Sequence, residues 1–256
     1  MAQSFTPGTY RLRVTANGNR DDIRLDVPAV TLVGQQTQLV VLTPTLGVGL
    51  VDGATVVEKG AYAAYPNMNA RVRVVSGIAG SLITASAGTT VVEAGAVSPA
   101  IGQYRTVPAG AASWVIKSGS NTVATPPINL AAGSDSTVLI TGASAAATAV
   151  LLADDNHPAT LITNTNLRLV NGLAGSSAGL SMSVDFSLVA SNVSPGTTSG
   201  YRPVPGNTNM RLEVATPLSV TPISLQNGLN IPGGSVYSIF VLGDSATPVT
   251  TIRKDR

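Results

Sequence analysis

The side chains best suited to chemistry lie between Asp154 and Pro158, in the stretch "DDNHP", which holds the single histidine of the chain. Carboxylates beside His157 could ligate a metal ion, and the imidazole could serve a serine as a general base. The same residue types also form ordinary solvated turns. We favour the turn, because a metal shell or a triad would have to be assembled without a second histidine.

Calcium is the other ion that this stretch could bind, since Asp154, Asp155 and Asn156 offer hard oxygen ligands. The stretch lacks the alternating D-x-D-x-D-G spacing and the closing acidic residue of a calcium loop. Asp52 and Asp255 also follow apolar runs. We therefore interpret the acidic residues as strand ends of a repeated pattern, with calcium as the weaker alternative.

Two glycine-rich stretches, "GIAGS" (77–81) and "GLAGSSAG" (172–179), could be read as phosphate-binding loops. Such loops need a following helix N-terminus and usually a lysine, and neither is present in the sequence pattern. Flexible loops between strands are the better interpretation.

Aromatic residues could form a sugar-stacking platform, and the candidates are Trp114, Tyr104 and Tyr201. Trp114 stands at an alternating strand position, which favours packing in a core. The two tyrosines occupy equivalent places before a proline turn. We expect each of their hydroxyl groups to tie a loop to the body of the domain.

Composition excludes several classes of function. There is no cysteine, so disulfides, thiolate metal sites and thiol catalysis are excluded. Charged residues make up 11% of the chain, the net charge is +2, and the basic residues gather only at Arg253, Lys254 and Arg256. We expect no nucleic-acid partner. No serine has a credible base, so we expect no enzyme, no catalytic residue and no cofactor.

The chain holds no apolar run of about eighteen residues, the length that a membrane-spanning helix needs. The longest candidate, "ASAAATAVLLA" (143–153), fits a turn that leads into a strand. The opening "MAQSFTPGTYRL" has neither a basic start nor an apolar stretch, so no signal peptide is apparent. A surface rich in Ser, Thr, Gly and Ala favours an exported protein, located outside the cell, on its surface or in the periplasm.

The elements that must carry these residues are short β-strands. Hydrophobic residues reach 44% but aromatic residues only 4%, and 26 Gly and 16 Pro supply many turns. Strand candidates recur every eight to twelve residues, as in antiparallel β-sandwiches of the immunoglobulin-like, Greek-key type.

A repeated phrase sets the organisation of the chain. "INLAAGSDSTVLITG" begins at Ile128, "LNIPGGSVYSIFVLG" at Leu229, and a shorter copy, "VTLVGQQTQLVVLT", at Val30. Each reads as an alternating apolar stretch, a glycine turn and an apolar run, which predicts a hairpin.

The opening half of the repeat occurs only twice. "ARVRVVSGIAG" from Ala70 pairs with "NLRLVNGLAG" from Asn166, and "YRTVPAG" from Tyr104 pairs with "YRPVPGN" from Tyr201. We predict two complete β-sandwich repeats, residues 66–162 and 163–256, preceded by a partial one, residues 1–65, that corresponds to the closing half.

These phrases resemble a bacterial family known as domain of unknown function 4397. The matching stretches are 71–75 and 168–171, 97–99 and 193–195, 107–110, 6–10, 130–133 and 152–156. An acidic segment common in that family after its first strand is replaced here by "SGIAGSLI" and "NGLAGSSAG". The resemblance implies an exported or surface-attached sandwich repeat without catalytic residues.

A half sandwich exposes an apolar face and an unpaired edge, which promote association. Residues 1–65 could pack on the next repeat as an extra layer, could complete the sheet of another chain by strand addition or swapping, or could reflect a displaced repeat frame. We predict a structural, adhesive or assembly role with self-association through residues 1–65 and a cell-surface partner. A glycan-binding or other ligand-binding module is the alternative.

Overall fold

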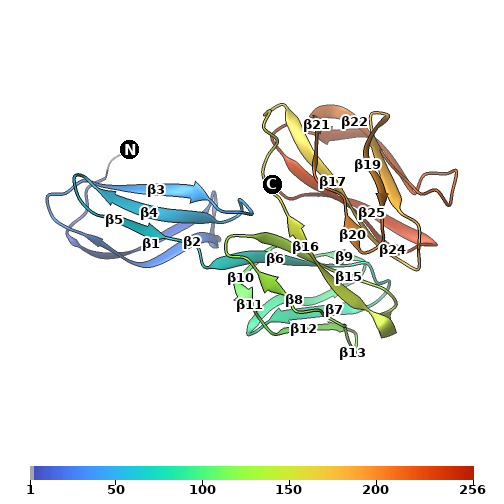
Figure 1. Ribbon diagram of the computed structural model, residues 1–256, viewed down its shortest axis with the longest axis horizontal. Helices are drawn as coiled ribbons and strands as arrows, with labels where there is room; N and C mark the ends of the chain where they lie inside the picture. The colour runs from blue at the N-terminus through green and yellow to red at the C-terminus, as the bar shows by residue number, and fades with distance from the viewer. Residues whose placement is uncertain (1–2) are drawn as a thin grey trace.

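The computed structural model describes residues 3–256, and these residues form an all-β protein of sandwich-type domains (Figure 1). This confirms the predicted fold class. The only helical element within residues 3–256 is a three-residue 3-10 turn, Ser144–Ala146. It leads into strand β16 (Thr148–Asp154), as the sequence "ASAAATAVLLA" predicts. Every sheet takes its strands from one of the three ranges 1–65, 66–162 and 163–256, which are called here the first, second and third units.

The second unit consists of two main sheets. One has the order β10-β6-β15-β16 with β9 beside β6, and the other has the order β13-β12-β7-β8; β11 and β14 form a separate pair. The remaining bounds are β6 Asn69–Ser76, β7 Leu82–Ala87, β8 Thr90–Val97, β9 Ala100–Ile101, β10 Arg105–Pro108, β11 Gly110–Ala111, β12 Trp114–Ser118, β13 Asn121–Thr122, β14 Asn129–Leu130 and β15 Asp135–Thr141.

The third unit repeats this plan with the orders β20-β17-β24-β25, where β21 also pairs with β17, and β19-β18-β22-β23. The bounds are β17 Asn164–Ala174, β18 Leu180–Val184, β19 Ser187–Val193, β20 Thr197–Thr198, β21 Arg202–Pro205, β22 Asn207–Ala215, β23 Ser224–Ile231, β24 Val236–Asp244 and β25 Thr247–Lys254. Each complete unit buries its own apolar core between its two sheets.

One strand pair in each complete unit is parallel, which departs from the purely antiparallel arrangement that we expected. β15 pairs in parallel with β6, and β24 pairs in parallel with β17. The first strand of each unit therefore lies beside a strand from its closing half. Sequence periodicity shows that a strand has a buried face but not in which direction its neighbour runs.

The expected hairpin at each glycine turn is wrong. β14 and β15 belong to different sheets, as do β23 and β24, and as do β2 (Asn19–Leu32) and β3 (Gln38–Pro44). The turn carries the chain from one sheet to the other, and Gly133 and Gly234 adopt φ values of 71° and 72° there. Alternating apolar residues satisfy a strand in either arrangement, so the pattern could not distinguish them.

The first unit is a small two-sheet body. β1 (Gly8–Ala16) pairs with β2, and β3 pairs with β4 (Val51–Val57), which pairs with β5 (Tyr62–Tyr65). Its core is correspondingly small, with buried residues Leu25, Val27 and Val30. In Figure 1 this unit extends away from the other two instead of covering them as an extra layer.

Asp52 does not end a strand, contrary to our expectation. It is the second residue of β4, where its partner is Thr43, close to the turn between β3 and β4. Asp154 is the last residue of β16, and Asp255 directly follows β25. The acidic residue of the first unit is thus at the opposite end of its strand. Within residues 3–256 no helix has the length and apolar character needed to cross a bilayer.

Candidate functional site

The largest concentration of buried polar side chains lies between the second and third units. In the second unit, Arg73 of β6 donates from Nε to Oγ1 of Thr137 on β15 (2.9 Å), and Thr137 donates to Oδ2 of Asp154 (2.6 Å). The Tyr104 hydroxyl donates to the same oxygen (2.6 Å), and the Tyr104 ring lies 4.6 Å from the Arg73 guanidinium. Two strands and one loop thus converge on one carboxylate.

The third unit builds the same arrangement from the equivalent positions of its repeat. Arg168 of β17 donates from Nε to Oγ of Ser238 on β24 (2.7 Å), and Ser238 donates to Oδ2 of Asp255. The Tyr201 hydroxyl donates to that oxygen (3.4 Å), and the Tyr201 ring lies 4.7 Å from the Arg168 guanidinium.

Two ion pairs join the second unit to the third, each between an arginine of one unit and an aspartate of the other. Arg168 donates from Nη2 to Oδ1 of Asp154 (2.5 Å), in the other unit, and Arg73 donates from Nη1 to Asp255. All four side chains are at most 2% exposed. Each unit therefore supplies one guanidinium and one carboxylate to its neighbour, and neither pair can form in a unit on its own. We call these four residues with Thr137, Ser238, Tyr104 and Tyr201 the exchange network.

An extension of the exchange network neutralises a third arginine. Arg71 of β6 donates from Nε to Oδ1 of Asp135 (2.8 Å), and Asn156 donates to Oδ2 of Asp135 (2.7 Å). The Tyr104 ring lies between two guanidinium groups, because Arg71 is also 4.6 Å from its centroid. Three arginines thus meet three aspartates, so the formal charges balance.

The surroundings of Asp154 and Arg168 favour the charged forms of both side chains. Burial would raise the pKa of Asp154, but Arg168 and Arg73, with hydrogen bonds from Thr137 and Tyr104, hold that pKa below its usual value. Burial would lower the pKa of Arg168, but Asp154 raises it. Burial and the nearby Asp154 raise the pKa of Tyr104. Asp154 and Arg168 therefore remain charged near neutral pH, where general acid–base catalysis needs a group that exchanges protons.

Apolar packing surrounds the exchange network. The residues buried between the two units are Val75, Leu139, Leu152, Val170, Phe240 and Leu242. The backbones also approach closely, since the N–H of Gly243 donates to the carbonyl oxygen of Gly77 (3.0 Å). A Cβ on Gly77 would lie 1.9 Å from the carbonyl oxygen of Gly172. Only glycine at position 77 permits this approach.

The loop between β3 and β4 joins the first unit to this cluster. The N–H of Gly47 donates to the carbonyl oxygen of Gly133 (2.8 Å), and Leu50 is 1% exposed. A Cβ on Gly49 would overlap the guanidinium of Arg71. The side chain of Asn67 donates to the carbonyl oxygen of Arg24 (2.7 Å), and so fixes the link between the units.

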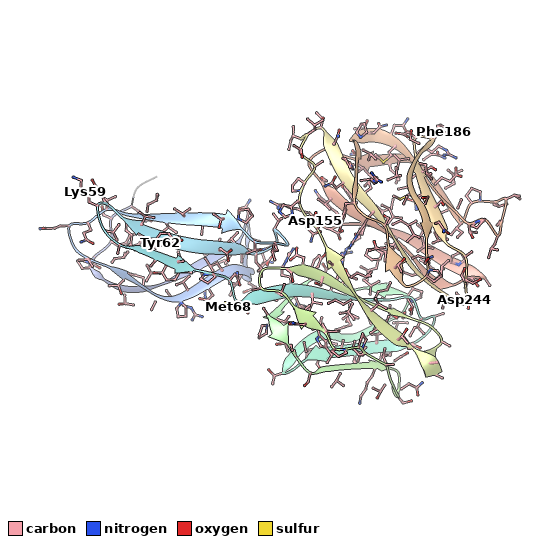
Figure 2. The ribbon with its side chains drawn as sticks, in the orientation of Figure 1. Lys59, Tyr62, Met68, Asp155, Phe186 and Asp244 are labelled. Carbon is pink, nitrogen blue, oxygen red and sulfur yellow. The ribbon has the colours of Figure 1, made fainter. Side chains whose placement is uncertain are left out.

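A cleft of about 520 Å³ opens where all three units meet. Leu46 lines it from the first unit, Asp155 from the second and Tyr201 from the third. Figure 2 shows Asp155 at this junction. The charged groups at its floor, Asp154 and Arg168, are already paired with each other.

The structure separates Asp155 from the other two residues that we considered as calcium ligands. Asp154 and Asn156 are buried in the cluster described above, whereas the Asp155 side chain is 69% exposed. Oδ1 of Asp155 accepts a hydrogen bond from the backbone N–H of His157 (3.1 Å) and lies 2.6 Å from Nδ1 of its ring. Within residues 3–256 no group of three or more His, Cys, Asp or Glu side chains forms a metal cluster.

The aromatic residues considered for sugar stacking have other contacts. Trp114 is partly buried and packs against the core of the second unit, as predicted. The hydroxyl groups of Tyr104 and Tyr201 tie their loops to the carboxylates that end the last strands, also as predicted. A guanidinium covers a face of each tyrosine ring.

Sequence reasoning missed Arg73 and Arg168 as the centre of this cluster. Both belong to the phrase "RVRVV" or its counterpart, which we noted only as a strand. An arginine inside an otherwise apolar strand was the available signal, because a buried charge requires a partner. Which carboxylate each of these arginines pairs with depends on how the two units dock.

Comparisons with known proteins add little. No family model matches the chain, and no curated protein matches it. Among solved structures, the Bacillus anthracis TIE protein matches 94% of this chain at 8% identity, with a TM-score of 0.21. The chain corresponds to 50% of that structure. A similarity at this TM-score carries no inference about fold or function.

Proposed function

We propose that this protein is a non-enzymatic, exported or surface-located repeat protein with a structural, adhesive or assembly role. The observation that carries the proposal is the exchange network. The arginine and aspartate side chains that could have served catalysis are instead exchanged between two repeats, each at most 2% exposed. Buried, reciprocally paired charges favour one geometry of an interface, because another docking would break the Arg168–Asp154 and Arg73–Asp255 pairs.

A fixed geometry suits a spacer or a building block. The second and third units share an apolar core in addition to their ion pairs, so they are expected to move as one body. The first unit is attached by the loop between β3 and β4. Its strand β3 lies at the edge of a sheet and pairs only with β4 among the described residues. We propose that the paired units supply rigidity and that residues 1–65 supply the contact with other molecules. Membership of the domain of unknown function 4397 family, which the sequence pattern suggests, agrees with this role.

The test combines solution mass with surface retention. Light scattering of the full chain over a concentration series would reveal assembly, and display on a bacterial surface, followed by washing, would reveal retention. We expect assembly or retention, together with no hydrolysis of a panel of ester, glycoside and phosphate substrates. A discrete monomer that is not retained would overturn the proposal, and so would a specific turnover.

A further inference from the structure

Strand β3 of the first unit has an unoccupied neighbour position. In the second unit β15 lies between β16 and the parallel strand β6, and in the third unit β24 lies between β25 and the parallel strand β17. Among the described residues β3 pairs only with β4. The missing neighbour is the one that the opening half of a repeat supplies in the other two units.

The second sheet of the first unit lacks the corresponding neighbour. In the third unit β22 lies between β23 and β18, and β18 comes from the opening half of that repeat. The counterpart of β22 in the first unit is β1, and among the described residues β1 pairs only with β2. The same missing half therefore leaves an open strand in both sheets.

The backbone of β3 presents free hydrogen-bonding groups at this edge. The carbonyl oxygen of Thr37 accepts a hydrogen bond from the N–H of Glu58 (2.9 Å). Hydrogen-bonded pairs alternate along an antiparallel ladder, so Leu39 and Val41 also direct their N–H and C=O groups toward β4. Val40 and Leu42 alternate with them and turn their N–H and C=O groups to the open side. Main-chain groups of this kind are what an added strand pairs with.

The side chains of Val40 and Leu42 are apolar and incompletely covered. They are 44% and 45% exposed, although their cross-strand partners Thr55 and Gly53 are buried. The core-facing residues of the equivalent strands are fully covered, with Val138 and Ile239 both 0% exposed. We attribute this difference in exposure to the strands of the opening half, which lie beside the equivalent strands in the two complete units.

Few of the usual protections against strand addition are present. Edge strands commonly carry charges, prolines or bulges that prevent pairing. β3 reads "QLVVLTP", without a charged residue, and its single proline, Pro44, is its last residue. Its pairing with β4 is regular from Gln38 to Pro44.

We infer that the edge of β3 is an acceptor site for the opening half of a repeat of this kind, which can be added to the chain as a peptide. Its first strand adds parallel to β3, and its apolar side chains cover Val40 and Leu42. A folded second copy is the poorer donor, because both of its opening strands, β6 and β17, are already paired within their own units. This inference rests on the proposed assembly role and names its partner.

The experiment uses the full chain and a fluorescent peptide of residues 164–175, "NTNLRLVNGLAG", which contains the whole of β17. A peptide of the same composition in scrambled order is the control. Fluorescence anisotropy measures binding, and amide hydrogen exchange locates it. We expect saturable binding of the first peptide, with at least tenfold slower exchange at Val40 and Leu42 and unchanged exchange in β15.

Variants of β3 separate edge pairing from general adhesion. Leu42→Pro removes an N–H that points to the open side and spares the bonds to β4, so we expect affinity to fall at least tenfold. Leu39→Ser, on the other face of the same strand, should change affinity less than twofold. If Leu42→Pro does not fold, Val40→Lys places a charge at the same edge and should produce the same loss.

Four results would overturn the inference: no binding, equal binding of the scrambled peptide, binding that the edge variants leave unchanged, or protection located outside β3. Protection of β3 that rises with protein concentration in the absence of peptide would also overturn it, because the edge would then belong to a second copy. Assembly or surface retention without peptide binding would leave the proposed function standing and remove only this partner.

Discussion

The first unit and the pair formed by the second and third units use the same kind of strand with different results. β15 and β24 are almost entirely buried, whereas β3 has exposed residues along most of its length. All three are apolar strands that follow a turn between sheets. The apolar pattern of a strand therefore does not bury it, because burial requires neighbours on both edges and both faces.

The largest expected effect comes from breaking the exchange network. Asp154→Ala removes the acceptor of Arg168, Thr137 and Tyr104, and leaves the buried guanidinium of Arg168 without its ion-pair partner. We expect a loss of about 5 kcal/mol in the free energy of unfolding of the paired units. Urea unfolding followed by circular dichroism measures it.

The control for this variant is Asp26→Asn in the first unit, which breaks ion pairs with the exposed Arg11 and Arg13. Exposed pairs are screened by water, so its unfolding midpoint should match that of the unchanged protein. Equal effects of the two substitutions would contradict the distinction between the paired units and the first unit.

The apolar part of the same interface predicts a somewhat smaller effect. Phe240 is 0% exposed between the two units, and Phe240→Ala should cost about 3–4 kcal/mol through lost burial and the cavity left behind. Phe186 is 82% exposed at the tip of the third unit, as Figure 2 shows. Phe186→Ala should change stability by less than about 0.5 kcal/mol. Thermal unfolding of both variants tests the contrast.

Close backbone contact predicts a third effect. Gly77→Ala places a methyl group against the backbone of Gly172 and should cost about 1–3 kcal/mol by forcing the two units apart. Gly200→Ala is the matched control, because nothing lies within 4 Å of its added Cβ. Small-angle scattering should show a larger radius of gyration for Gly77→Ala alone. An unchanged envelope and stability would refute the close contact.

The smallest expected effect is a dependence of stability on pH at the extremes. The pKa of Asp154 is below its usual value of 3.8 in the folded protein, so its contribution is present above that value and is lost as pH falls through the folded pKa. The pKa of Tyr104 is above its usual value of 10.0. Its contribution is present below that value and is lost as pH rises through the folded pKa.

We therefore expect the unfolding free energy of the paired units to be constant between about pH 5 and pH 9 and to fall on either side. Urea titrations at a series of pH values, monitored by near-ultraviolet circular dichroism, measure it. The Asp154→Ala variant should lose the acidic decrease that this carboxylate causes. An unfolding free energy that changes markedly between about pH 5 and pH 9 would contradict this expectation.

Much of the fold could be predicted from local patterns. Turn residues at regular spacing and alternation in stretches such as that from Ala70 gave the all-β class, because both reflect interactions between neighbours in sequence. The glycine turns at Gly133 and Gly234 were located correctly, but their connection was misread. A hairpin and a crossing between sheets need the same alternation and the same positive φ.

The candidate site could be predicted only in part. The sequence placed an acidic residue after the last strand of each complete repeat, and it showed that Tyr104 and Tyr201 occupy equivalent places. It could not show that Arg168 meets Asp154 instead of Asp255. That choice depends on contact between residues that belong to separately folded units.

Local sequence patterns are sufficient to show that this protein is built of short strands in a repeated order, in which the opening half of the repeat occurs twice and the closing half three times. Strand periodicity and turn chemistry depend on residues close together in the chain, so they can be recognised from one sequence. The tertiary structure alone decided that two repeats exchange their charges and that β3 keeps an open edge. Both features depend on which surfaces come into contact in the folded protein. That contact decides whether a buried charge finds a partner and whether an apolar side chain is covered.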